Sequence, residues 1–251
     1  MTLSGALVPH APILLPQLAS RETRSASERL QTALARIDGA EADVVVIVSP
    51  HGARDGVYAN ARASLDGLGV RGVEVCWTPE EEAAEEVARG WRRPRLDGPI
   101  DHGIAVPLMA GYASGKPVVA AAVADVVAPR GSTLDDALSA GLALADAVER
   151  LAEKRRVRVV ASAHTSAALS PRAPLTERPE ACATEEAVLE ALGSDAGELV
   201  DLSRSLWADG GACGVAVLAM LGRVFPGRGA DIVFYECPVG IGYVVASVAR
   251  P

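Results

Sequence analysis

The chain has 251 residues, of which 49% are hydrophobic, and it carries a formal net charge of −8 at pH 7. This acidic balance disfavours nucleic acids and anionic membranes as partners, because both are negatively charged. No apolar run reaches the length of a membrane span, no basic signal region opens the chain, and the four cysteines are widely spaced without a CxxC pair. We therefore expect a cytoplasmic protein with reduced thiols.

Two apolar runs, each followed by a Pro-His pair, predict strands in the first part of the chain. Leu3 to Val8 precedes Pro9-His10, and Val44 to Val48 precedes Ser49-Pro50-His51-Gly52. Unbroken β-branched runs are typical of strands buried on both faces of a parallel sheet. We expect Ser49-Pro50 to end the second strand, because proline cannot donate a hydrogen bond to a neighbouring strand. The apolar spacing from about Ser20 to Ile37 predicts an amphipathic helix between them.

The rest of the chain alternates between strand-like and helix-like segments. The sequence predicts short strands or hairpins over 56–77, helices over 80–91, 104–112, 134–153, 184–192, 196–206 and from the Gly-rich segment 210–214 to about 224, and strands over 116–122, 157–162, 232–235 and 243–248. This alternation indicates an α/β protein, namely a three-layer α/β/α sandwich with a mostly parallel, mixed central sheet. No linker divides the chain, so we expect a single domain over residues 1–251.

The two Pro-His pairs predict a metal site at one edge of that sheet. Ligands of open α/β sheets bind at the carboxyl ends of the strands, where both His10 and His51 would lie. A lone histidine there would be interpreted as a hydrogen-bonded loop residue, but two at equivalent strand ends favour a metal. Two imidazoles and one anionic ligand, with open positions left over, is the arrangement of oxygen-activating non-haem iron, and zinc would accept it too.

Two residues are candidates for the anionic ligand. Cys213 lies between glycines at the start of a predicted helix, where the helix dipole favours a thiolate, although a small buried residue fits the same position. Glu236 ends an apolar strand, where its carboxylate must be paired or reach solvent. The residues alone leave both alternatives open.

The other two histidines are candidates for proton transfer. His102 stands in Asp101-His102-Gly103 before an apolar helix, and His164 follows the predicted strand 157–162. An imidazole titrates near neutral pH, so each could orient a substrate or move a proton, or else be a helix cap or a turn residue. No acyl-transfer elbow, phosphate-binding loop or dinucleotide fingerprint occurs, and no general-base carboxylate stands out for a zinc hydrolase.

Four segments, in this order, resemble class III (LigB-type) extradiol ring-cleavage dioxygenases and the related Memo proteins. They are Val8-Pro9-His10-Ala11-Pro12, Val48-Ser49-Pro50-His51-Gly52, Asp101-His102-Gly103 through Pro107-Leu108, and Ser162 through Leu169. The resemblance implies an Fe(II) site at the sheet edge, with another divalent metal as an alternative, and cleavage of a catecholic ring with O2. It implies His10 and His51 as metal ligands and His102 as a histidine that faces the substrate.

Two positions differ from the dioxygenase pattern. Where the dioxygenases have a glutamate ligand, this chain has Cys213 within Gly211-Ala212-Cys213-Gly214, which resembles the metal cysteine of Memo proteins. Ala167 takes the place of the family's acid–base histidine, and His164 would then move protons from a shifted position.

We therefore expect an Fe(II)-dependent extradiol dioxygenase with His10, His51 and Cys213 as metal ligands and with His102 and His164 as catalytic residues. The alternative is a Memo-like metal-binding protein without dioxygenase turnover, with a redox or interaction role. The expected partners are a small aromatic substrate and O2, not nucleic acid or membrane, and a homo-oligomer stays open.

Overall fold

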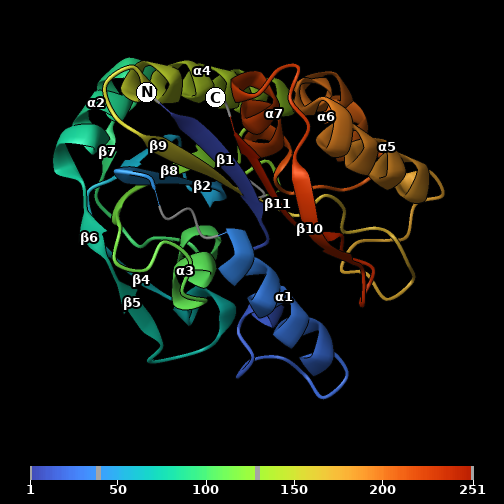
Figure 1. Ribbon diagram of the computed structural model, residues 1–251. Helices are drawn as coiled ribbons and strands as arrows, with labels where there is room; N and C mark the ends of the chain where they lie inside the picture. Colours follow the sequence, from blue (N-terminus) through green and yellow to red (C-terminus); the bar gives the residue numbers. More distant parts are fainter. Residues whose placement is uncertain (1, 38–40, 128–130, 250–251) are drawn as a thin grey trace.

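A nine-stranded mixed sheet organises the molecule. The computed structural model describes residues 2–37, 41–127 and 131–249. The strands of the sheet are β1 (Leu3–Val8), β2 (Val44–Gly52), β3 (Gly56–Tyr58), β6 (Thr78–Pro79), β7 (Arg95–Leu96), β8 (Pro117–Ala124), β9 (Val157–Ser162), β10 (Asp231–Glu236) and β11 (Tyr243–Ala249). Their order is β10-β11-β1-β9-β2-β8-β3-β7, and β6 pairs with β8 (Figure 1). A separate two-stranded sheet joins β4 (Arg62–Ser64) to β5 (Glu74–Cys76).

The centre of the large sheet is parallel. β9 pairs in parallel with β1 and with β2, and β2 pairs in parallel with β8. Antiparallel pairs occur toward the edges, where β11 lies between β1 and β10 and where β3 pairs with β8. These pairings confirm the predicted α/β class with a mostly parallel, mixed sheet.

Helices cover both faces of the sheet. They are α1 (Arg24–Ile37), α2 (Glu81–Trp91), α3 (His102–Met109), α4 (Leu134–Ala152), α5 (Ala181–Ser194), α6 (Leu199–Ala208) and α7 (Val215–Val224), with short 3₁₀ turns η1 (Pro12–Leu14), η2 (Asp66–Leu68) and η3 (Ala196–Glu198). One face packs against α2, α4, α5, α6 and α7, and the other against α1, α3 and the β4–β5 hairpin (Figure 1).

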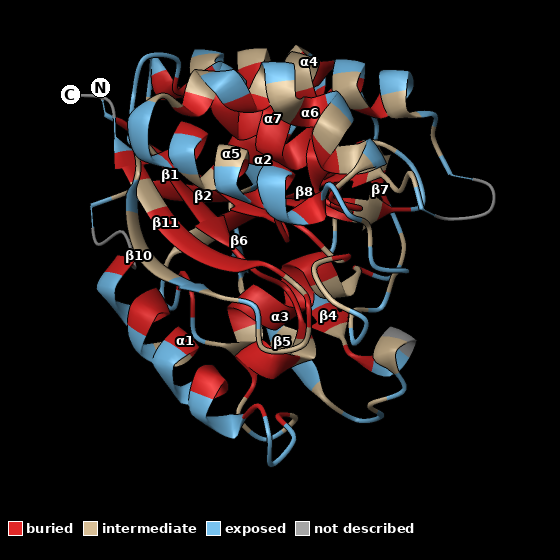
Figure 2. Ribbon diagram, turned by 90° about the vertical axis from the view of Figure 1, so that its right-hand side faces the viewer, coloured by how far each residue is buried: buried red, intermediate tan, exposed pale blue. Residues whose placement is uncertain are grey.

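The apolar run of β2 shows why the strand is hydrophobic on both sides. Val44, Val46 and Val48 belong to the core on the α4 and α7 face, whereas Val45 and Ile47 belong to the core on the α1 and α3 face. Successive side chains of a strand point to opposite faces, so a strand between two helical layers needs apolar residues at every position. Figure 2 shows the buried residues gathered on the sheet and on the helix faces that cover it.

Several predicted boundaries differ from the structure by a few residues, and two of them have a clear cause; one of these two bears on the site. β2 does not end at Ser49-Pro50 but continues to Gly52, which pairs with Ala124 after a register irregularity. Proline is tolerated there because regular pairing is already interrupted. α1 begins at Arg24 rather than near Ser20, because the Ser20 hydroxyl accepts a hydrogen bond from the Thr23 backbone N–H and forms a turn.

Within the described ranges, none of the helices combines the length and the apolar character that a membrane span requires. The single-domain organisation stays a prediction.

Candidate metal centre

All four histidines of the sequence come together at the carboxyl ends of the central strands. His10 follows β1, His51 lies at the end of β2, His102 is the first residue of α3, and His164 follows β9. The ring centroid of His10 lies 4.8 Å from that of His51, 5.3 Å from that of His102 and 4.2 Å from that of His164. Four segments distant in sequence therefore contribute imidazoles to one place.

Hydrogen bonds determine which nitrogen of His10 is free. The Ser162 hydroxyl donates its single hydrogen to the Gly103 carbonyl oxygen at 2.5 Å. Its contact with His10 Nδ1, at 3.1 Å, must therefore be a hydrogen bond that the Nδ1–H donates. The second nitrogen, Nε2, is then left with a lone pair, which is the form in which a histidine binds a metal.

Asp125 has the same effect on His51. The Nδ1 atom of His51 lies 3.0 Å from Asp125 Oδ2, and a carboxylate can only accept a hydrogen bond. The Nδ1–H of His51 is the donor, so in the neutral ring the lone pair lies on Nε2. A carboxylate that holds the distal side of an imidazole in this way also raises the basicity of the metal-binding nitrogen.

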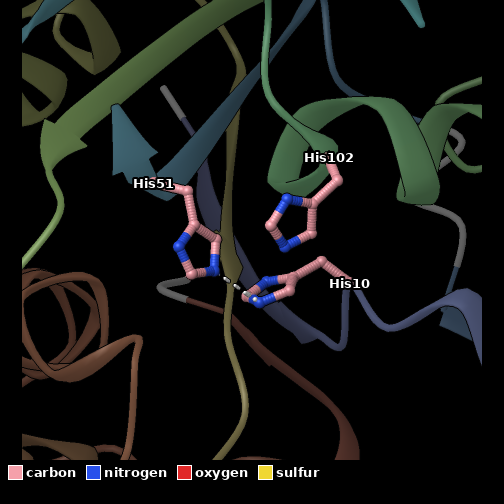
Figure 3. A group of neighbouring side chains, drawn as sticks. All are labelled: His10, His51 and His102. Carbon is pink, nitrogen blue, oxygen red and sulfur yellow. Dashed lines mark hydrogen bonds between the residues drawn. The ribbon is translucent and has the colours of Figure 1, made fainter. Parts of the chain in front are cut away.

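The Nε2 atoms of His10 and His51 face each other. His51 Nε2 and His10 Nε2 are 3.1 Å apart, and the imidazoles of His10, His51 and His102 point toward one another (Figure 3). Two bare lone pairs at this distance repel unless a cation lies between them. Two nitrogens each about 2.1 Å from one ion, at roughly a right angle, are about 3 Å apart. The donor pair thus fits a single metal ion.

The electrostatic surroundings of His51 also favour a positive charge. Burial lowers the pKa of His51, but hydrogen bonds to Asp125 and Cys213 outweigh burial and raise the pKa to about 10. By contrast, burial together with neighbouring His164, His51 and His102 holds the pKa of His10 well below its usual value. The site therefore accommodates one positive charge between these groups, supplied by a proton or by a metal ion.

Cys213 lies next to this pair. Its Sγ atom is 3.5 Å from His10 Nε2, just before the first turn of α7. Gly214 makes this approach possible, because a Cβ atom at that position would collide with Ala163 in the segment that precedes His164. Potential ligand atoms within 4.8 Å of one another form two sets, His10 with His51 and His102, and His10 with His164 and Cys213. Among the described residues, neither set includes a carboxylate, and the predicted combination of His10, His51 and Cys213 is not one of the two sets.

Glu236, the other candidate for the third ligand, is paired with Arg29. Both of its carboxylate oxygens accept hydrogen bonds from Arg29 on α1, at 2.5 and 2.7 Å, at the exposed edge strand β10. The carboxylate is thus paired at the surface, in agreement with the expectation that a carboxylate at this strand end is either paired or reaches solvent.

His102 is held by a network around Asp101. The Asp101 side chain caps α3 by accepting a hydrogen bond from the Gly103 N–H at 2.7 Å, and it also accepts hydrogen bonds from Ser49 at 2.5 Å and Tyr58 at 3.2 Å. The Ser49 hydroxyl in turn accepts a hydrogen bond from the His51 N–H at 3.1 Å. The network ties the first turn of α3 to the end of β2. Burial, followed by the neighbouring His51, lowers the pKa of His102 to about 4, so this imidazole is neutral at neutral pH.

His164 is the most enclosed of the candidate proton carriers. It is 8% exposed, and its ring and that of Tyr243 meet in a T-shaped contact with their centroids 5.4 Å apart. Its Nδ1 atom is buried without a hydrogen-bond partner in the described part of the chain. Burial, followed by His51 and His102, lowers its pKa to about 3. A neutral imidazole with a free buried nitrogen can bind a proton, a substrate hydroxyl or a metal.

A cavity of about 550 Å³ opens beside His51 and His102. Its apolar wall includes Leu68, Leu96 and Ile100, and Arg54 contributes a positive charge. This volume lies within the range of small-molecule sites. The cavity gives a small organic molecule access to the edge of the histidine cluster.

Two residues that support the site were missed from the sequence. Asp125 follows the apolar strand β8, and Ser162 ends the apolar strand β9. The rule that identified His10 and His51, a polar residue at the carboxyl end of a buried strand, would have found both. Which histidine each one supports depends on the order of strands in the sheet.

Comparisons with known proteins agree with this geometry. The family model described as the catalytic LigB subunit of aromatic ring-opening dioxygenase matches residues 4–245. Among solved structures, the crystal structure of the uncharacterized protein JW3007 from Escherichia coli K12 aligns with a TM-score of 0.60 and 15% sequence identity over 99% of each chain. At this identity the likeness shows the fold alone. No curated protein sequence matches the chain.

Proposed function

The chain belongs to the family of the catalytic LigB subunit of aromatic ring-opening dioxygenases, and on that premise we propose that it is an Fe(II)-dependent extradiol-type dioxygenase. His10, His51 and Cys213 would hold the metal. The substrate would be a small catechol, bound in the cavity beside His51 and His102, and the second substrate would be O2.

One observation carries the metal site of this proposal. The Nδ1–H groups of His10 and His51 are already donated to Ser162 and Asp125, and their Nε2 atoms lie 3.1 Å apart. Two Nε2 atoms this close need a positive charge between them, which a bound metal ion would supply. Cys213, at 3.5 Å from His10 Nε2, would supply the anionic ligand that compensates part of the metal charge.

The residues of the chain suggest how proton transfer would proceed. Bound Fe(II) would supply the redox chemistry that couples O2 to an aromatic ring. The apolar wall formed by Leu68, Leu96 and Ile100 would hold the ring, and His102, which lines the same cavity, would accept a proton from a catechol hydroxyl. The Nδ1 atom of His164, which has no hydrogen-bond partner among the described residues, would take up a second proton transiently and return it. Both imidazoles are neutral at neutral pH, as a proton acceptor must be.

The Memo-like alternative, metal binding without dioxygenase turnover, is supported by two departures from the dioxygenase pattern. Cys213 takes the place of a carboxylate ligand, and Ala167 has no imidazole. The two proposals share the metal site and differ only in turnover.

Oxygen uptake on a panel of catechols separates them. The protein is purified anaerobically, stripped with a chelator, loaded with Fe(II) and analysed for metal. We expect O2 consumption that matches the formation of a ring-fission product in the wild type. His10→Ala, treated in the same way, should show neither iron nor turnover. One Fe(II) per chain without O2 consumption on any catechol would replace the dioxygenase with the Memo-like alternative.

We also propose a cytoplasmic location. All four cysteines are free, and three of them are exposed, a state that a reducing compartment maintains.

A further inference from the structure

A buried carboxyl group contacts the loop that carries His164 and is not used in the proposed mechanism. Glu185 on α5 is 2% exposed, and its Oε1 atom is 2.6 Å from the hydroxyl of Thr165, the residue that follows His164. Its Oε2 atom has no hydrogen-bond partner among the described residues, where no ion pair includes Glu185 either. An unpaired carboxylate is costly to bury, so a group in this position needs an explanation.

Three segments meet at this carboxyl group. The Thr165 N–H donates to the Gly242 carbonyl oxygen at 3.3 Å, and the Gly242 N–H donates to the Ser166 carbonyl oxygen at 2.9 Å. Gly242 comes just before β11, and a Cβ atom there would collide with Glu185 Oε1 and Thr165 Oγ1. The next residue is Tyr243, whose ring contacts the imidazole of His164. Glu185 thus touches both the loop that carries His164 and the turn that carries its aromatic neighbour.

The number of hydrogens available for hydrogen bonding indicates the protonation state of the Glu185 carboxyl group. Thr165 Oγ1 lies 2.6 Å from Glu185 Oε1 and 3.2 Å from the Gly242 carbonyl oxygen, but one hydroxyl has a single hydrogen. If the carboxyl group carries a proton, Glu185 donates to Thr165 and Thr165 donates to Gly242, so both contacts are hydrogen bonds. If it is ionised, Thr165 can donate to only one of its two acceptors, and Glu185 Oε2 stays buried as a charged oxygen without a donor.

The pKa agrees with the hydrogen count. Burial raises the pKa of Glu185 to about 6, although the hydroxyl groups of Thr165 and of the nearby Tyr235 on β10 partly oppose the rise. Tyr235 is the titratable side chain that faces the carboxyl group, and its own pKa is raised, mainly by burial, so it is neutral.

We propose that Glu185 is a positioning residue, whose carboxyl group joins Thr165 to the start of β11 and thereby sets where the imidazole of His164 lies beside His10. The part that this position of His164 plays in catalysis rests on the proposed function. The position can nevertheless be measured in a protein that turns over no substrate. Glu185 has no contact with His10, His51 or Cys213 among the described hydrogen bonds, so metal binding should not depend on it.

Histidine NMR can test the proposal without any catalysis. The chain has only four histidines, so ¹⁵N-histidine labelling of the full chain with Zn²⁺ added gives four ring systems, which single histidine substitutions assign. We expect Glu185→Ala to shift the His164 ring resonances and to leave those of His10, His51 and His102 in place. Glu185→Gln, which can still donate to Thr165, should keep all four. Glu186→Ala, an exposed neighbour on the same helix, is the matched control and should change none.

A second pair of variants covers the case in which Glu185→Ala does not fold. Thr165→Val removes the hydroxyl and should shift the same His164 resonances, whereas Thr165→Ser should keep them. Unchanged His164 resonances in a folded Glu185→Ala or Thr165→Val protein would overturn the proposal. Equal shifts of all four ring systems would overturn it as well, because they would indicate a general structural role.

The charge state is tested by stability against pH. The folded-state pKa is raised, so the stabilisation from Glu185 is complete below about pH 4.5 and is lost as the pH rises through about 6. Glu185→Gln removes this ionisation. The difference in Tm between Glu185→Gln and the wild type should therefore increase from pH 5 to pH 7.5. A difference that is the same at both pH values would show that Glu185 does not act as a neutral acid.

Discussion

Ser162 and Asp125 decide which nitrogens of His10 and His51 are free to bind a metal, although neither residue would touch it. Each accepts the Nδ1–H of one imidazole and leaves Nε2 as the nitrogen with the lone pair. Outer groups of this kind fix both the tautomer and the orientation of a ligand. The strength of the metal site should therefore depend on residues outside the ligand set.

Asp125→Asn should weaken metal binding without abolishing it. The amide oxygen can still accept the His51 Nδ1–H, but the negative charge that makes His51 more basic is lost. We expect metal affinity to fall about 10–100-fold, the usual cost of removing such a partner. Isothermal titration with Zn²⁺ gives the value, with the exposed Asp201→Asn on α6 as the charge-matched control. Equal affinity of the two variants would contradict the role of Asp125.

Cys213→Ser tests the thiolate ligand. Loading with Co²⁺ should give the wild type a thiolate-to-metal charge-transfer band, and Cys213→Ser should lose that band and bind the metal more weakly. Cys182→Ser removes an exposed thiol on α5 and serves as the control, with an unchanged spectrum expected. A band that persists in Cys213→Ser would show that the sulfur is not a ligand.

His164→Ala tests proton transfer. If the wild type cleaves a catechol, we expect kcat to fall about 10²–10⁴-fold, the usual contribution of a positioned acid–base group. Iron content should stay the same, because His164 is not among the proposed ligands. The comparison is made on ring-fission absorbance at matched iron content. Equal rates would make His164 a structural residue.

Among the secondary-structure elements, the first turn of α3 connects fold stability to the site. Asp101 caps the helix that begins with His102, and the same carboxylate bonds to Ser49 at the end of β2. Burial, followed by the Asp101 carboxylate, raises the pKa of Tyr58, so this hydroxyl keeps its proton and can donate to Asp101. Loss of the cap should therefore affect two elements at once.

Asp101→Ala should destabilise the fold more than the loss of an ordinary cap does. A cap contributes about 0.5–2 kcal/mol, and each buried donor left without a partner costs about 1–3 kcal/mol more. Thr133→Ala removes the cap of α4, where Thr133 accepts a hydrogen bond from the Asp136 N–H, and is the matched control. Urea unfolding should show a larger loss for Asp101→Ala, and metal titration should show weaker binding for this variant alone. Equal effects of the two variants would contradict the coupling.

The apolar strands of the centre were predictable because their burial on both faces leaves an unbroken β-branched run. The end of β2 was not predictable, because the pairing of Gly52 with Ala124 depends on β8, a strand far along the chain. Similarly, the sequence placed His10 and His51 at one sheet edge but did not identify Asp125 or Ser162 as their partners. Local patterns predict elements, whereas pairings between residues need the strand order.

At the scale of the whole molecule, the proposed metal centre would join the ends of β1 and β2 to the start of α7. An ion bound by groups from three segments stabilises the folded chain relative to the unfolded chain. At a free metal concentration of 100 times Kd the gain is about 2.7 kcal/mol. Tm should rise on addition of Zn²⁺ to the chelator-treated wild type and should not rise for His10→Ala. An equal rise in both proteins would indicate binding elsewhere.

The coordination of the metal tests the central claim most directly. X-ray absorption of the protein loaded with one equivalent of Zn²⁺ should show nitrogen or oxygen neighbours at about 2.0–2.1 Å and one sulfur neighbour at about 2.3 Å. The sulfur neighbour should disappear in Cys213→Ser, and zinc itself should be absent from His10→Ala. A zinc-loaded wild type with only nitrogen and oxygen neighbours would contradict a centre built from His10, His51 and Cys213.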